Sequence, residues 1–132
     1  MGLTSIAYML YLKHWNMTFQ HEWRVEFFQR PNGHTPVLEY LDSLDERYRA
    51  KILAYVELLR SKGGRLYEPY AKHVQGSIWE LRVDLGRRAS RIFYFAAQGQ
   101  RIVLLHAFLK KTQKIPTSEI SIALRYYQED DQ

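Results

Sequence analysis

The chain has 132 residues, 46% of them hydrophobic and 14% aromatic, which is enough for one domain with a sizeable core and too few for two. It has no cysteine, which excludes disulfides, thiol nucleophiles and thiolate metal sites and fits a cytoplasmic protein. The net charge of +5 is unevenly spread: residues 62–114 carry eleven Lys and Arg against three acids, or +8, and the remainder carries −3. This asymmetry indicates an anionic partner on one region, with a merely soluble basic surface as the alternative.

Residues 1–18 differ in composition from the rest of the chain. The apolar stretch 6–12 is short and follows no basic residue, so it fits neither a secretory signal nor a membrane span, which needs about 20 apolar residues. Met17 begins a stretch that resembles an ordinary protein start. We therefore interpret residues 1–18 as an N-terminal extension or mis-set start, and residues 19–132 as a single domain.

Alternation of apolar and polar residues predicts a strand at 23–28, followed by a turn-rich connector at 30–36 and a short helix at 37–41. Ser43 and Glu46 have capping-box spacing, which predicts the start of a longer helix. One face of this helix is apolar and is formed by Tyr48, Ile52, Tyr55, Val56 and Leu59. Gly63-Gly64 ends the helix, and residues 65–77 are expected to form a loop.

Three further strands are predicted at 78–85, 89–97 and 101–110, joined by tight turns. Pro116 suits a first helical turn, and a core-facing stripe follows at Ile120, Ala123, Leu124 and Tyr127. The order β-α-α-β-β-β-α predicts an α+β fold, an antiparallel sheet with helices packed on one face. The other face and the strand ends are then left for the basic residues.

A cationic cluster lies at the end of the last predicted strand. The apolar run 102–109 is interrupted only by His106 and ends in Lys110, Lys111 and Lys114. A buried strand would present these charges at a fixed place. This pattern indicates a site for a polyanion, such as a phosphate backbone.

Two arginines lie within the neighbouring strands. Arginine inside a strand is costly to bury without a partner, so it faces solvent or meets an anion. Arg82 could pair with Glu80 or Asp84 on its own strand, whereas Arg91 has no acid on its strand, which favours a ligand role. Tyr94 has the opposite strand parity to Arg91 and is expected in the core.

His106 shares strand parity with Lys110, so both are expected on one face. It could move a proton, or it could be a structural histidine with its hydrogen bonds satisfied. His73, next to Lys72, is a second possible proton carrier if its loop folds over the sheet.

Other chemistries are not indicated. The chain has no nucleophile elbow, phosphate loop or dinucleotide fingerprint. Its five histidines lack metal-ligand spacing with carboxylates, so we expect no metal.

Three sequence blocks resemble the phage-derived branch of the RelE/HigB toxin family. The blocks are Trp79-Glu80-Leu81-Arg82-Val83, Arg91-Ile92-Phe93-Tyr94 and Leu105–Lys114, followed by Pro116 and Glu119-Ile120. The resemblance covers about Phe19 to Tyr127 in order and spacing. The first block is weakly specific, and the third is the most specific.

The resemblance implies the toxin of a type II toxin–antitoxin system: a metal-independent, cofactor-free endoribonuclease that cuts mRNA, usually on the ribosome. The implied partners are a helix-turn-helix antitoxin, mRNA and the ribosome, with no membrane. Such enzymes let a ribose 2′-OH attack the adjacent phosphate. Two other functions fit the same fold: a ParE-like toxin that inhibits a protein such as a topoisomerase, and an inactive phage-derived binding module.

The resemblance also assigns roles to residues. Arg82 and Arg91 would bind the phosphate and the transition state, Lys110 would act at the substrate, and His106 would be the acid or base, with His73 in reserve. If His106 is buried among apolar side chains, a lysine becomes the better candidate. The expected RNA-binding residues are Lys111, Lys114, Arg88, Lys72 and His73.

Overall fold

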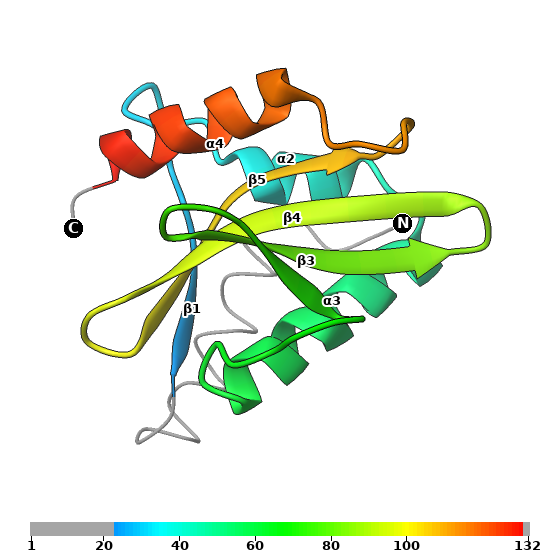
Figure 1. Cartoon of the computed structure of the whole chain (residues 1–132), viewed down its shortest axis with the longest axis horizontal. Coiled ribbons are helices and arrows are strands. Elements are labelled where there is room, and N and C mark those ends of the chain that lie inside the picture. The colour runs from blue at the N-terminus through cyan, green and yellow to red at the C-terminus, as the bar shows by residue number, and fades with distance from the viewer. Residues whose placement is uncertain (1–22, 131–132) are drawn as a thin grey trace.

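The computed structural model describes residues 23–130, so the expected extension 1–18 lies outside the described part of the chain. Five strands and three helices lie within the described residues (Figure 1). They are β1 (Arg24–Phe27), α2 (Pro36–Asp42), α3 (Glu46–Ser61), β2 (Ala71–Gln75), β3 (Ile78–Leu85), β4 (Arg88–Ala97), β5 (Arg101–Leu109) and α4 (Thr117–Glu129).

The strands form one mixed sheet in the order β1-β5-β4-β3-β2. The predicted α+β class is confirmed, and β3, β4 and β5 match their predicted bounds to within one residue. The sheet is not wholly antiparallel as expected, because β1 pairs parallel with β5. The chain between these two strands includes two helices and three strands, which is ample length for the crossover that a parallel pair requires.

The prediction of a loop at 65–77 was wrong for its second half, where β2 pairs antiparallel with β3. Only Ala71 of its five residues is buried, so β2 lacks the apolar alternation that marks a strand in a sequence. It is an edge strand, for which polar and charged side chains are usual. Its pairing with β3 is extended by the Arg82 amide, which donates to the Tyr70 carbonyl at 2.8 Å.

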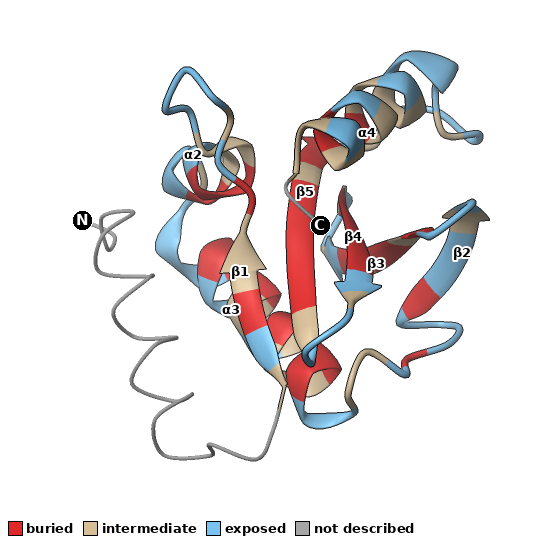
Figure 2. Ribbon diagram, turned by 90° about the vertical axis from the view of Figure 1, so that its left-hand side faces the viewer, coloured by how far each residue is buried: buried red, intermediate tan, exposed pale blue. Residues whose placement is uncertain are grey.

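The helices cover both faces of the sheet, not one as predicted. Helices α2 and α3 pack against one face, and α4 packs against the other (Figure 2). The reason lies in β4, where Ile92 and Tyr94 enter the core under α2 and α3 while Phe93 and Phe95 enter the core under α4. A strand that is apolar on both sides needs cover on both.

The apolar face predicted for α3 is confirmed, since Tyr48, Ile52, Val56 and Leu59 are fully buried and Tyr55 is half-buried. The predicted capping box is wrong. Ser43 instead donates its hydroxyl hydrogen to the Tyr40 carbonyl at the end of α2 (2.6 Å), and α3 begins at Glu46 after Asp45.

Three acidic residues tie α4 to the rest of the fold. Glu119 meets the His106 ring at 2.9 Å, Glu129 accepts two hydrogen bonds from Arg30, and Asp130 lies 3.7 Å from Arg101. Between these contacts Ala123 is buried, with Ile120, Leu124 and Tyr127 half-buried around it. Helix α4 is thereby held against β5, and the β3 side of the same face is left for the site.

We predict that the His106–Glu119 contact stabilises the docking of α4. In a double-mutant cycle of His106→Ala and Glu119→Ala, urea unfolding should give a coupling of about 1 kcal/mol, because the two partly buried groups share one hydrogen bond. Additive effects of the two substitutions would contradict this role.

Candidate active site

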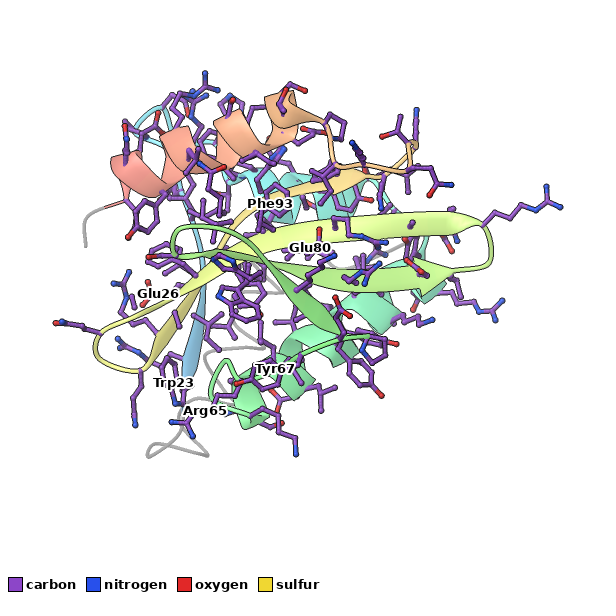
Figure 3. All side chains as sticks on the ribbon, in the orientation of Figure 1. Trp23, Glu26, Arg65, Tyr67, Glu80 and Phe93 are labelled. Carbon is purple, nitrogen blue, oxygen red and sulfur yellow. The ribbon has the colours of Figure 1, made fainter. Side chains whose placement is uncertain are left out.

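Strand pairing brings the two predicted arginines face to face. Arg82 on β3 lies directly opposite Arg91 on β4, which in turn lies opposite Phe108 on β5. The adjacent row across the sheet contains Lys72, Glu80, Phe93 and His106. Because side chains alternate along a strand, both rows lie on the face that carries α4. Figure 3 shows Glu80 and Phe93 near the middle of this face.

Arg91 is almost fully buried, with 4% of its side chain exposed. Its Nη1 donates to Asp84 Oδ1 and to the Ser90 carbonyl, both at 2.9 Å, and its Nε is buried without a hydrogen-bond partner. As expected, no acid lies on the strand of Arg91, but Asp84 reaches it from β3. Like charges directly opposite each other destabilise a sheet, so the Arg82–Arg91 pair requires anions nearby.

Glu80 is one such anion, with only 6% of its side chain exposed. Its Oε1 lies 3.8 Å from Arg82 Nε, and its Oε2 is buried without a hydrogen-bond partner. Burial raises the pKa of the Glu80 carboxyl, although the charges of Arg91, Arg82, Lys110 and Lys72 act to lower it. The sequence indicated Glu80 only as a partner for Arg82. Its alternation with Arg82 on one face of β3 is the signal that also places it in the candidate site.

An open hollow of about 850 Å³ lies where the β3–β4 turn meets the end of β5. This volume is within the range of ligand sites in proteins. The hollow is lined by five cationic residues and their neighbours: Arg87, Arg88, Ala89, Arg91, Leu109, Lys110, Lys111, Thr112 and Gln113. The structure thus places the Lys110 and Lys111 cluster beside Arg91, in a concave, positively charged surface.

His106 is only 13% exposed and is held by Glu119. Its ring stacks on Phe108, with centroids 5.6 Å apart, and meets the edge of Tyr126 at 5.9 Å. It shares the face of Lys110, as predicted, and its contacts with Glu119, Phe108 and Tyr126 also fasten α4 to the sheet.

His73 does not join the arginines. It lies opposite Trp79, on the face away from Lys72 and Glu80, and its ring Nε2 donates to the Gly76 carbonyl at 2.7 Å. Lys72 is exposed, lies beside Glu80 in register and is 3.8 Å from Glu68. Of the two, only Lys72 can therefore contribute charge to the site.

Arg88 borders the hollow, but its guanidinium is bound to Asp45 at 2.5 Å and lies over the Tyr48 ring. The hydrogen bond that Arg88 donates to Asp45 raises the pKa of Arg88. Lys114 is exposed beyond the hollow. Tyr94 is buried in the core, as expected, and burial raises the pKa of its hydroxyl.

Within residues 23–130, no group of three or more His, Asp or Glu side chains is placed to hold a metal ion. No helix in the same range is long and apolar enough to cross a membrane.

The chain matches no curated protein sequence. Residues 39–128 match the family described as phage-derived protein Gp49-like (DUF891), a stretch that runs from α2 through α4 and includes the arginine pair and the lysine cluster. Proteins of this family are toxins of the RelE/HigB type that pair with an antitoxin. The match covers more than half of the 132 residues of the chain. The chain therefore belongs to the phage-derived Gp49-like family of the RelE/HigB-type toxin superfamily.

Proposed function

We propose that the chain is a toxin that cleaves mRNA on the ribosome without a metal ion or other cofactor. The observation that carries this proposal is the Arg82–Arg91 pair, which lies on one face of the sheet beside Lys110 and Lys111. A protein surface that places Arg91, Lys110 and Lys111 around a hollow, with Arg82 on the facing strand, favours a phosphate backbone as its ligand.

The reaction that such a surface supports is transfer of a phosphoryl group within the RNA chain. The 2′ oxygen of a ribose attacks the adjacent phosphorus, the bond to the 5′ oxygen breaks, and the products are a cyclic phosphate and a 5′-OH. The phosphate gains negative charge in the transition state. Guanidinium groups suit this task, because they stay charged and present a planar fork to two phosphate oxygens.

We assign Arg91 to the transition state, because it borders the hollow and is fixed by Asp84 and Ser90. A group that is held in place before the reaction stabilises developing charge without reorganisation. Arg82 is partly exposed on the facing strand and would bind a second oxygen. Asp84, a mostly exposed carboxylate, would give way to the phosphate at Arg91.

The remaining cations have simpler roles. Lys110, rather than His106, would give the proton to the leaving 5′ oxygen, since Lys110 lines the hollow and His106 is engaged with Glu119. Lys111, Lys114 and Lys72 would contact neighbouring phosphates. His73 and Arg88 are less suited to contact RNA, as their side chains are held elsewhere.

The family implies an antitoxin, and we expect a helix-turn-helix protein with an acidic segment that covers the basic hollow. Covering Arg91, Lys110 and Lys111 would neutralise the site by the same charge complementarity that binds RNA.

We predict that Arg91→Ala removes about 2–4 kcal/mol of transition-state stabilisation, which is roughly 30- to 1000-fold in cleavage rate. Wild type, expressed from an inducible promoter in bacteria, should arrest growth and produce new 5′ ends in mRNAs, as mapped by primer extension. Arg91→Ala should do neither.

The matched control is Arg101→Ala. Arg101 is also a sheet arginine paired with a carboxylate, Glu26, but it does not line the hollow. Unfolding curves of both purified variants show whether each is folded. Undiminished cleavage by a folded Arg91→Ala protein would remove Arg91 from the site, and arrest without new 5′ ends would point to a protein target instead.

Lys110→Ala and Lys111→Ala should each weaken RNA binding and reduce its dependence on salt. Each lost phosphate contact should lower the slope of log K against log salt by about 0.7 for single-stranded RNA. Binding isotherms at several salt concentrations measure the slope, with Lys62→Ala, an exposed lysine after α3, as the control. If all three variants and the wild type have the same slope of log K against log salt, neither lysine contacts a phosphate, and both serve only to keep the protein soluble.

A further inference from the structure

Two of the buried polar atoms without a hydrogen-bond partner in residues 23–130 lie in the candidate site. They are Oε2 of Glu80 and Nε of Arg91. The two residues are diagonal neighbours across the β3–β4 pair, a separation that long side chains can bridge. Folded proteins rarely leave buried groups unpaired, so such atoms at one site call for an explanation.

One small group can satisfy both atoms. A carboxylate oxygen only accepts hydrogen bonds, and a guanidinium Nε only donates one. A hydroxyl does both, because it donates its hydrogen to Glu80 and accepts from Arg91. A phosphate oxygen could accept from Arg91 but has no hydrogen for Glu80, and a deoxyribose lacks the group altogether.

Glu80 is also the best-placed proton acceptor on this face. Arginine does not lose its proton in proteins, and Lys72 and Lys110 accept none while charged. The His106 ring is bound to Glu119. Asp84 is mostly exposed and is paired with Arg91 Nη1.

We propose that the Glu80 carboxylate accepts the proton of the attacking ribose 2′-OH, held between Glu80 and Arg91. This inference rests on the proposed ribonuclease function and adds to it a catalytic residue and a reason to require RNA over DNA.

The step balances as follows. The O2′–H bond breaks and its proton goes to Glu80, while its electron pair forms the O2′–P bond. The P–O5′ bond breaks, and the 5′ oxygen takes a proton from the Lys110 ammonium group. Afterwards Glu80 releases its proton to water, and Lys110 takes up a proton from water to become an ammonium group again.

Access to Glu80 depends on Arg82. Arg82 Nε lies 3.8 Å from Glu80 Oε1, and 31% of its side chain is exposed. Its partial exposure leaves Arg82 room to turn toward a phosphate oxygen, and such a turn would open a path from the substrate to the carboxylate.

The surroundings of Glu80 set its pH dependence. Burial raises its pKa, against lowering charges from Lys72 on β2, Arg82 on β3, Arg91 on β4 and Lys110 after β5. On α4, Glu119 faces the same side but is bound to His106. Cleavage should increase with pH until Glu80 is fully ionised and then level off.

The same shift affects stability. A raised pKa means that folding favours the neutral carboxyl, so wild type loses stability as pH rises from the usual glutamate pKa to the raised one. Glutamine keeps the neutral form at every pH. Glu80→Gln should therefore lack this loss of stability between the usual glutamate pKa and the raised one.

The test compares wild type, Glu80→Gln and a matched control, Glu68→Gln, which removes an exposed carboxylate near Lys72. Single-turnover cleavage of mRNA on programmed ribosomes is measured from pH 5 to 9, together with RNA affinity and urea unfolding. Glu80→Gln should cleave at least 100-fold more slowly and lack the rising limb, with affinity within about threefold of wild type. Glu68→Gln should behave as wild type.

Equal rates and pH profiles for wild type and a folded Glu80→Gln would overturn this inference and leave the ribonuclease function standing. If wild type itself cuts no RNA, the function and the inference fall together. Glu80→Asp is a further variant that keeps a carboxyl group. Its cleavage rate should still rise with pH but should level off at a lower value than that of wild type. If the cleavage rate of wild type does not rise with pH between 5 and 9, Glu80 is not the base, and this result holds even if Glu80→Gln fails to fold.

Discussion

The site depends on one constraint: Arg82 and Arg91 face each other across β3 and β4, and Arg91 is buried. Two facing guanidiniums repel, and they persist in a fold only where anions offset the repulsion. In the free protein, Asp84 bonds Arg91 and Glu80 lies near Arg82. Under the proposed function, an RNA phosphate would replace the exposed Asp84 at Arg91, while Glu80 would remain in the sheet. The arginine pair would then be stable enough to fold and able to bind a phosphate.

The rest of the architecture protects this arrangement. Strands β4 and β5 are apolar on both sides, so α2 and α3 cover one face and α4 covers part of the other. His106 fastens α4 through Glu119, which keeps the helix over β5 and leaves Glu80, Arg82 and Arg91 beside it. The contact with Glu119 gives His106 a structural role as an anchor of α4, beside the acid or base role that the sequence suggested for it.

Much of this could be predicted from the sequence, for reasons that the structure makes clear. The alternation of apolar and polar residues and the glycine turns were enough to locate β3, β4 and β5. The lysines after Leu109 indicated the position of the hollow. Strand β2 was missed because a polar edge strand has no apolar pattern, and α4 was misplaced because a helical stripe does not say which face it covers. The partners of Arg91 and His106 come from another strand and from a helix, so only the register and packing could reveal them.

The most direct test of the central claim is the chemistry of the RNA ends. Total RNA from bacteria expressing the wild-type chain would be sequenced with a ligase that joins only 5′-hydroxyl ends. In-line attack by the 2′-OH predicts discrete 5′-hydroxyl ends within coding sequences, soon after induction and before growth stops. Growth arrest without such ends would contradict the ribonuclease function.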